Sequence, residues 1–230
     1  MTRAPKAAII DRSSTTPMGR TSDARERLVA AAMELIYARG YQGVGVDELC
    51  ARAGVRKGSF YYFFRSKRDL ALAALDLRWK LAREHMVAPI LEGDAPPLER
   101  IRRFFDAMAA ASTQEKTTTG ECGGCAFGNL SAEMSSHDAK IRRRVRKVFD
   151  EIAGFVAAAL AEAVRGGDVA GIDAAENARA VVAYMEGLLL LSRTYNDPSI
   201  LRRLGEKAVD VAGARSNGNV GRARKTGGRR

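Results

Sequence analysis

The stretch that decides the fold is VDELCARAGVRKGSFYYFFRSKRDL, residues 46–70. Apolar residues at helical spacing predict a short helix over 46–53 that ends at Gly54. A second short helix is predicted over 56–63, and a long helix begins near Lys67. Two short helices joined by a tight turn that contains glycine form the helix-turn-helix arrangement, whose second helix enters the major groove of DNA.

Apolar periodicity continues on both sides of this stretch. A supporting helix is expected over 22–39, with Thr21 or Ser22 as its N-cap and Gly40 just past its end. Further helices are expected over 67–87, 97–112, 138–165 and 173–195, followed by one from Pro198 to the residue before Gly213. Strand alternation does not recur, so the predicted fold class is all-α, with two helical units joined by the helix at 67–87.

The positive charge of the chain is concentrated at its two ends. The 230 residues carry a net charge of +11, with a sequence pI of about 9.9. Residues 1–70 have a net charge of +6, residues 71–212 a net charge of -1, and residues 213–230 another +6. This distribution indicates a polyanion as the partner of the first 70 residues.

Composition argues against several other classes of protein. No apolar run approaches the roughly 18 residues of a membrane span, and the amino terminus has no continuous hydrophobic segment for export. Three cysteines cannot all pair within one chain, which favours a reducing cytoplasm. No residues are arranged as a catalytic constellation, so we expect no enzyme activity, no cofactor and no metal.

The helix-turn-helix region resembles a known family. The residues that carry the likeness are Arg27-x-x-x-Ala31-Ala32-x-x-Leu35, Gly40-Tyr41, Val46-Asp47-Glu48-Leu49, Ala53-Gly54-Val55-x-Lys57-Gly58-Ser59-x-Tyr61-x-x-Phe64 and Ser66-Lys67-x-x-Leu70. In this order they are similar to the DNA-binding domain of TetR/AcrR-family transcriptional regulators. The resemblance implies a homodimer that binds double-stranded operator DNA, with a dimer interface that includes the helices at 138–165 and 173–195.

The resemblance gives the two expected domains, and composition gives the expected arm and tail. Residues 1–21 form a flexible basic arm, and residues 22–82 form a three-helix DNA-binding domain with its helix-turn-helix at about 45–64. Residues 83–212 form a larger helical domain for ligand binding and dimerisation. Residues 213–230, rich in Gly, Arg and Asn, are expected to form a disordered basic tail.

Eight residues are predicted to contact DNA: Val46, Arg56, Lys57, Gly58, Ser59, Tyr61, Tyr62 and Lys67. The tyrosine hydroxyls suit phosphates, whereas Lys57 and Ser59 suit base edges or nearby phosphates. Gly58 lets the backbone approach the DNA closely, and Lys67 is expected to clamp a phosphate. Phe60 and Phe64 are assigned to the core.

Three positions depart from the family's pattern. Val44 and Gly45 stand where hydroxyl residues are usual, which removes potential phosphate contacts. Arg56 stands where Ser is frequent, so the recognition helix lacks its usual cap and gains a cation.

A second segment, Gly124-Cys125-x-x-Gly128-Asn129-Leu130-Ser131-x-Glu133, is similar to a stretch found in one branch of the family, where Gly-Cys leads into a helix. The polar, glycine-rich residues 114–124 are expected to form the preceding loop, which places Cys125 at or just before a helix start. There the positive end of the helix should lower the pKa of the thiol and favour the reactive thiolate.

Several interpretations of Cys122 and Cys125 remain open. A structural zinc site would need four ligands, and a thioredoxin-like pair would need a βαβ setting that is missing. A regulatory thiol that is alkylated or oxidised, with Cys122 as its resolving partner, is a further hypothesis. Alternatively, Cys125 is simply a small apolar residue of the ligand-binding domain.

Candidate residues for an effector pocket are Phe104, Phe105, Met108, Phe127, Phe149, Tyr184 and Met185, together with Cys122 and Cys125. Side chains of this kind more often belong to the plain core than to a pocket. The sequence thus predicts a sequence-specific repressor that a small-molecule effector or a thiol modification releases from its operator. The alternative hypothesis is a non-specific architectural DNA-binding protein that acts through the basic arm and tail.

Overall fold

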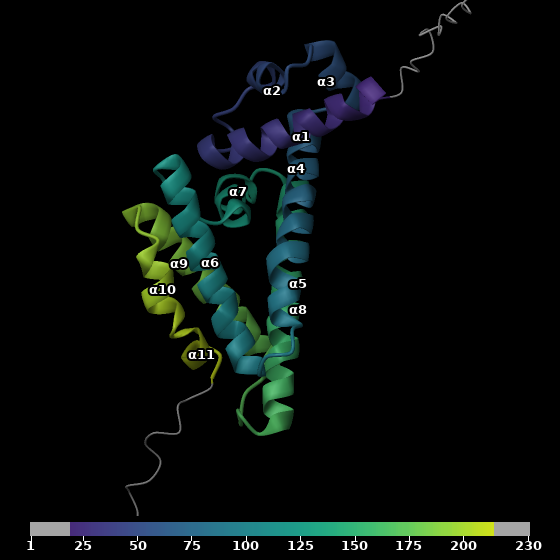
Figure 1. Ribbon diagram of the computed structural model, residues 1–230. Coiled ribbons are helices and arrows are strands. Elements are labelled where there is room, and N and C mark those ends of the chain that lie inside the picture. The colour runs from purple at the N-terminus through teal and green to yellow at the C-terminus, as the bar shows by residue number, and fades with distance from the viewer. Residues whose placement is uncertain (1–18, 214–230) are drawn as a thin grey trace, which may run out of the picture.

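The computed structural model describes residues 19–213, which form a small helical domain above a larger helical bundle (Figure 1). The small domain contains α1 (Gly19–Arg39), α2 (Val46–Ala53), α3 (Lys57–Phe63) and the start of α4 (Lys67–Ala82). The short helices agree with prediction to within a residue. However, α1 begins at Gly19, so residues 19–21 of the predicted arm are helical, and residues 1–18 and 214–230 lie outside the described part of the chain.

The small domain has a hydrophobic core of its own. Leu28, Leu49, Phe60 and Leu70 are fully buried in it, one from each of its four helices. Gly54 adopts a left-handed conformation at φ 62° and ends α2, because a residue without a Cβ reaches this conformation at little cost. The tight turn after α2 therefore follows from this glycine.

The α4 helix connects the two domains. Leu70 and Ala74 belong to the core of the small domain, whereas Leu75 and Trp79 belong to the core of the larger one. The prediction that this helix closes near Val87 is wrong. It continues through a π-helical segment (Arg83–Val87) into α5 (Ala88–Leu91), and Pro89 is the second residue of α5.

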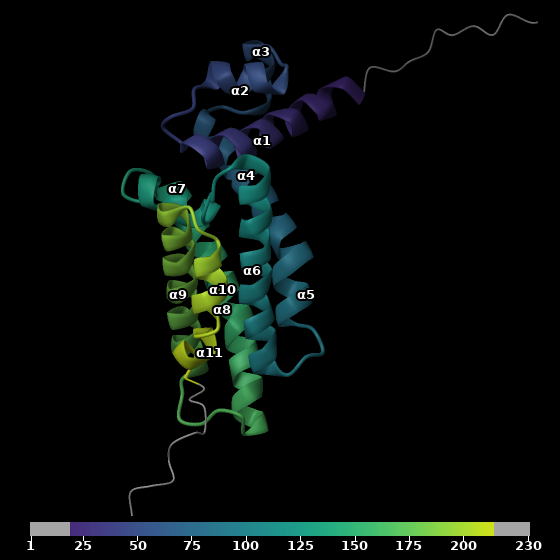
Figure 2. The same cartoon turned by 60° about the vertical axis from the view of Figure 1, so that its left-hand side comes forward.

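The larger domain is built from α6 (Pro97–Thr119), α7 (Ala126–Met134), α8 (Ala139–Gly166), α9 (Ala174–Tyr195), α10 (Ser199–Gly205) and α11 (Ala208–Val211). The single helix predicted after Pro198 is thus two short ones. Figure 2 shows α7 at the upper end of this bundle, next to the small domain.

The α6 helix is seven residues longer than predicted, so most of the expected loop at 114–124 is helical. Four threonine hydroxyls each donate to the backbone carbonyl four residues earlier: those of Thr113, Thr117, Thr118 and Thr119. The hydrogen-bonding capacity of these polar side chains is therefore used within the helix. Gly120 then ends α6 in a left-handed conformation.

The long helices α8 and α9 pack against each other, and each has an aspartate as its N-cap. Asp138 accepts from the N–H groups of Lys140 and Ile141, and Asp173 does the same for Ala175 and Glu176. Within residues 19–213, no helix is both long enough and apolar enough to span a membrane.

Candidate functional site

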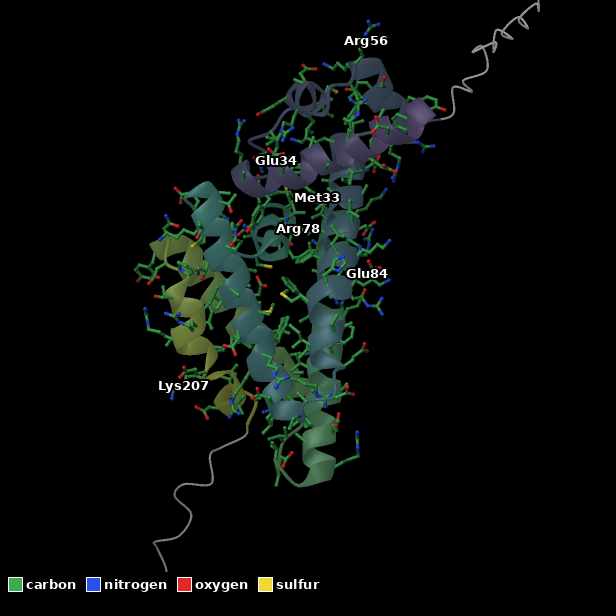
Figure 3. All side chains as sticks on the ribbon, in the orientation of Figure 1. Met33, Glu34, Arg56, Arg78, Glu84 and Lys207 are labelled. Carbon is green, nitrogen blue, oxygen red and sulfur yellow. The ribbon has the colours of Figure 1, made fainter. Side chains whose placement is uncertain are left out.

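The recognition helix α3 presents aromatic hydroxyls at the surface. Phe60 is fully buried and anchors the helix, whereas Tyr61 is 55% exposed and Tyr62 is 76% exposed. Arg56, the N-cap residue of α3, projects at the end of the domain that lies away from the larger bundle (Figure 3). These side chains thus form a polar and basic surface that is free to meet a phosphate backbone.

The structure shows what the three residues that depart from the family's pattern do: Val44, Gly45 and Arg56. Val44 is fully buried, so this position contributes to the core. Gly45 and Arg56 are the N-cap residues of α2 and α3, and neither makes a side-chain cap hydrogen bond. A Cβ placed on Gly58 would meet no atom within 4 Å, so the protein's own packing does not require glycine here.

Lys57 is paired within the domain. Its Nζ lies 2.7 Å from Oδ1 of Asp47, which joins the start of α3 to the start of α2. The hydrogen bond and charge of Asp47 raise the pKa of Lys57. Ser59 and Val46 are half-buried, and Val46 packs against the core of the small domain.

The structure gives Lys67 an internal role instead of the exposed position expected of a phosphate clamp. Its Nζ donates to the backbone oxygens of Tyr41 at 2.9 Å and Val44 at 3.0 Å. The same ammonium group lies 4.2 Å from the centre of the Tyr41 ring. Lys67 therefore fastens the loop between α1 and α2 to the start of α4.

This α1–α2 loop is also held by the larger domain, through a residue whose role the sequence did not reveal. The carboxylate of Glu133 on α7 accepts from the backbone N–H groups of Tyr41 at 2.7 Å and Gln42 at 2.6 Å. Gly40, at φ 79°, lets the chain turn over that carboxylate. At the other end of the same junction, the hydroxyl of Tyr37 donates to the carbonyl of Gly124 at 3.0 Å.

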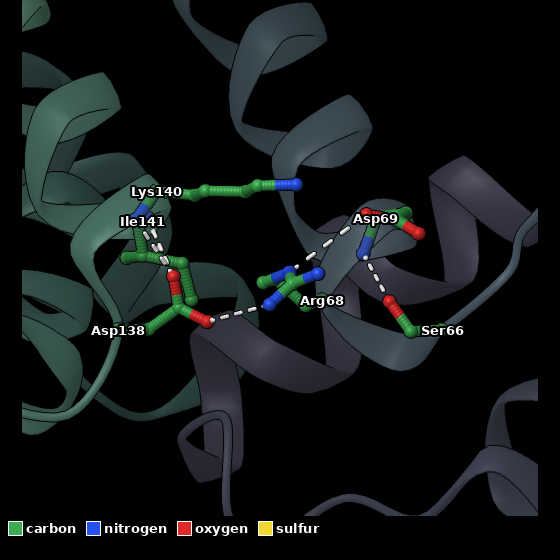
Figure 4. Close-up of polar contacts among 6 residues, drawn as sticks. All are labelled: Ser66, Arg68, Asp69, Asp138, Lys140 and Ile141. Atoms are coloured by element: carbon green, nitrogen blue, oxygen red, sulfur yellow. Dashed lines mark hydrogen bonds and ion pairs between the residues drawn. The ribbon is translucent and has the colours of Figure 1, made fainter.

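A second connection between the domains is centred on Arg68 (Figure 4). Its Nη1 lies 3.4 Å from Asp138 Oδ2, and its Nε lies 3.8 Å from Asp69 Oδ1. Asp138 caps α8, while Ser66 caps α4 by accepting from the N–H of Asp69 at 3.1 Å. One arginine thus links the first turns of two helices from different domains.

A cavity of about 330 Å³ lies in the larger domain where it meets the end of α1, next to this junction. Five of the predicted effector residues line it: Phe104, Met108, Cys125, Phe127 and Met185. The sequence missed Tyr37, Arg78, Trp79 and Glu115, which also line it. Most of the wall is apolar, and the polar groups gather where α1, α4 and α6 meet.

Four predicted effector residues lie elsewhere. Phe105 packs against Tyr184 and Gly205, and the hydroxyl of Tyr184 donates to the carbonyl of Leu204 at 2.7 Å. Phe149 packs half-buried against the core. Cys122 is buried beside a separate cavity, and its N–H donates to Oδ1 of Asn196.

Cys125 is the N-cap residue of α7, as predicted, and its sulfur accepts from the N–H of Gly128 at 3.4 Å. The predicted fall in its pKa is wrong. Burial raises the pKa of the Cys125 thiol well above its usual value, and the charge and hydrogen bond of Glu186 raise it further. The helix start does act in the expected direction, but the loss of solvation outweighs it.

The two cysteines of the C-x-x-C pair are free thiols that face different cavities. Within residues 19–213, no three His, Cys, Asp or Glu side chains are grouped so that they could hold a metal ion. The arrangement therefore consists of an exposed recognition helix, a cavity in the larger domain, and α7 between the two.

Comparisons with known proteins agree with this arrangement. A family model for bacterial regulatory proteins of the tetR family matches residues 28–74, and a model for the tetracyclin repressor-like C-terminal domain matches residues 97–207. The HTH-type transcriptional repressor NemR of Escherichia coli (strain K12) is 30% identical over 145 residues, which cover 63% of this chain and 69% of NemR.

Two solved structures show the same fold along most of the chain. The crystal structure of the reduced form of E. coli NemR has a TM-score of 0.71 and 26% identity, covering 81% of this chain and 95% of that one. A TetR transcriptional regulator from Chloroflexus aurantiacus J-10-FL has a TM-score of 0.73 and 29% identity, covering 83% and 94%. With both of its domains matched in order, this chain belongs to the TetR family of bacterial transcriptional regulators.

Proposed function

We propose that this regulator is a repressor that leaves its operator when a small molecule occupies the cavity or when Cys125 is modified. One observation carries the proposal: α7 touches both sites. Cys125 at its first turn lines the cavity, and Glu133 near its last turn holds the backbone of Tyr41 and Gln42. A displacement of α7 would therefore reach the loop that leads directly into α2.

The DNA-binding side of the proposal rests on the surface of α3. The exposed hydroxyls of Tyr61 and Tyr62 and the guanidinium of Arg56 are suited to phosphate oxygens. Lys57 can exchange Asp47 for a base edge or a phosphate, because both of these side chains are more than half exposed. Ser59 and the bare backbone at Gly58 complete this surface, and Val46 and Lys67 support it from within.

We also propose that the protein acts as a homodimer through α8 and α9. Leu190 is 62% exposed, and Leu191, Tyr195 and Val164 also leave apolar surface uncovered on these helices. Such a patch is typical of a protein interface. A twofold dimer would place two copies of α3 in successive major grooves, about 34 Å apart. Displacing α7 in either subunit would change that spacing.

The proposed partners are thus double-stranded operator DNA, a second copy of the chain and a small-molecule effector. We propose that the protein acts in the cytoplasm, with no cofactor and no catalysis.

The two routes of release from the operator differ in the reactivity that they require of the small molecule. Because the pKa of Cys125 is raised, little thiolate is present at neutral pH, so modification requires a strongly thiol-reactive agent. Reversible occupation of the cavity has no such requirement.

Sequencing of DNA captured by the full-length protein, followed by footprinting, tests the proposal. We expect protection of a twofold-symmetric site with a specificity ratio of about 10³ or more over random DNA. The Tyr62→Ala variant should lose this protection and remain a dimer, whereas the exposed Arg146→Ala variant should keep it. Binding without sequence preference, with a steep salt dependence, would instead indicate the architectural alternative.

A further inference from the structure

The arginine at the polar end of the cavity has no acidic partner. Arg78 is half-buried and lies with its guanidinium carbon 4.3 Å from the centre of the Tyr37 ring. Stacking of this kind fixes the plane of a guanidinium group and leaves its N–H edge available. Within residues 19–213, Arg78 forms no ion pair with a carboxylate.

The other shielded arginines of the molecule behave differently. Arg68, Arg100 and Arg144 are the remaining arginines with described side chains that are buried or half-buried. Each has a carboxylate partner: Asp138 for Arg68, Glu162 for Arg100 and Asp76 for Arg144. A shielded cation normally needs such a partner, because burial without one is costly. The exception is the arginine that lines the cavity.

Neither of the two carboxylates near the cavity, Glu115 and Glu186, forms an ion pair with Arg78 in the described part of the chain. Glu115 accepts from the N–H of Gly123 at 3.0 Å and lies beside the hydroxyl of Tyr37. Glu186 is hydrogen-bonded to Cys125 but is not among the residues that line the cavity, and its Oε1 is buried without a hydrogen-bond partner among the described residues. Burial raises the pKa of this carboxyl. Of the two charged residues that line the cavity, Arg78 and Glu115, Arg78 is the one whose N–H groups have no protein partner within residues 19–213 and can meet a ligand.

The rest of the cavity suits an apolar ligand body. Trp79, Phe104 and Phe127 contribute aromatic surface, and Met86, Met108 and Met185 contribute flexible thioethers that adapt to the shape of a guest. The volume of about 330 Å³ is at the lower end for small-molecule sites, so the ligand is small. A single ring with a short side chain has suitable dimensions.

We infer that this cavity binds small aryl or alkyl carboxylic acids, with the carboxylate on Arg78 and the apolar body among Trp79, Phe104 and Phe127. A guanidinium and a carboxylate can form two parallel, charge-assisted hydrogen bonds, which give both affinity and orientation. The inference rests on the proposed function only in so far as the same cavity holds the effector. Binding itself can be measured without DNA.

Trp79 supplies the measurement. It is the single tryptophan of the chain and lines the cavity, so its fluorescence reports occupancy of this site. The full-length protein would be titrated with 3-phenylpropanoate, 3-phenylpropanamide and 3-phenylpropylamine, which share one skeleton and differ in charge. We expect the acid to bind about tenfold or more tightly than the amide or the amine.

Variants at Arg78 separate charge recognition from shape. Arg78→Gln should weaken binding of the acid by about tenfold or more and leave the amide unchanged, while Arg78→Lys should retain part of the preference. Arg146→Gln, at an exposed position on α8, is the matched control and should behave like the original protein. If Arg78→Gln does not fold, the comparison of the three ligands and the Arg78→Lys variant still test the inference.

Three results would overturn the inference that the cavity binds carboxylic acids. They are tighter binding of the amine, equal binding of the acid and the amide, or no fluorescence response of Trp79 to any of the three probes. A mobility-shift assay on the captured operator keeps this inference apart from the proposed function. If the acid binds to the protein but does not release it from DNA, the proposed release mechanism is contradicted, while the inference that the cavity binds carboxylic acids is retained. Release by the amine alone would support the proposal that the cavity holds an effector, but it would contradict the inference that this effector is a carboxylic acid.

Discussion

Glu133 and Tyr41 are 92 positions apart in the sequence, yet the carboxylate of one lies 2.7 Å from the backbone nitrogen of the other. With the neighbouring bond to Gln42, this contact makes a side chain of the larger domain part of the DNA-binding domain's loop structure. Backbone N–H groups that donate to a carboxylate form charge-assisted bonds, which are stronger than those between neutral groups.

We expect Glu133→Ala to uncouple the two domains. The loss of these bonds should lower the free energy of unfolding by about 1.5–3 kcal/mol, and hydrogen exchange at the amides of Tyr41 and Gln42 should accelerate. Ligand binding to the cavity should persist while its effect on operator affinity falls. Glu176→Ala, at an exposed position on α9, is the control. Unchanged exchange at both amides would argue against the coupling.

Gly58→Ala should separate folding from DNA binding. Because a Cβ at this position meets open space and alanine favours a helix, the free energy of unfolding should stay the same or rise by about 0.5–1 kcal/mol. Operator affinity should nevertheless fall, since the added methyl group would stand between the helix backbone and the DNA. Parallel urea unfolding and mobility-shift titrations check this, and undiminished affinity would remove Gly58 from the proposed interface.

Alkylation of Cys125 should be slow and strongly pH-dependent. With a pKa raised by burial and by Glu186, the thiolate fraction should grow about tenfold per pH unit between about pH 7 and pH 9. Glu186→Gln removes a charge that raises this pKa, so the rate at neutral pH should increase. Peptide mass spectrometry after iodoacetamide treatment resolves each cysteine, and Glu176→Gln is the control on the same helix. A slower reaction in Glu186→Gln would contradict this account.

The Arg68–Asp138 link predicts part of the acid sensitivity. Burial opposes ionisation of Asp138, but the N–H groups of Ile141 and Lys140 and the guanidinium of Arg68 outweigh it and lower the pKa of Asp138. The resulting stabilisation is present above the unfolded-state pKa of about 3.9 and is lost as the pH falls through the lower folded-state pKa.

Urea unfolding across this pH range tests the link. Asp138→Ala should lower the free energy of unfolding by about 1 kcal/mol or more at neutral pH and converge with the original protein in acid. Asp173→Ala is the matched control, because Asp173 caps α9 in the same way and has no arginine partner among the described residues. Equal effects of both substitutions on the acid limb would show that Arg68 contributes nothing.

The exposed leucines of α9 predict a dimer that a single charge can break. Leu190→Asp should yield monomers in size-exclusion chromatography with light scattering, because burying an unpaired carboxylate in an apolar interface is costly. Operator affinity should drop with it, since each monomer reaches only one half-site. Leu81→Asp, which changes an exposed leucine on α4, should remain dimeric. A dimeric Leu190→Asp protein would place the interface elsewhere.

Local patterns were sufficient for the helix-turn-helix and for the position of Cys125. Gly54, the apolar spacing over 46–53 and the glycines directly before Cys125 are all signals within a few residues of sequence. The junction residues Glu133, Arg68 and Asp138 could not be found in this way. Each acts on a residue about 70 to 90 positions away, and periodicity does not say which helices meet.

The cavity shows the same limit at the level of single residues. Phe104 and Phe105 are adjacent and both fully buried, but Phe104 lines the cavity while Phe105 packs against α10. Residue type alone does not show which phenylalanine lines the cavity and which packs against α10. The pKa of Cys125 was mispredicted for a related reason, since the local effect of a helix start is visible in sequence and the burial around it is not.

The contacts of Glu133 also constrain how such regulators can be recombined. A chimera cut within α4 would join a foreign DNA-binding domain to a bundle whose α7 still offers a carboxylate at this junction. The graft would retain its response only if its own α1–α2 loop presented two backbone N–H groups at the same place. A graft designed to keep the response should therefore transfer the small domain together with α7, although these segments are separated by more than 40 residues of sequence.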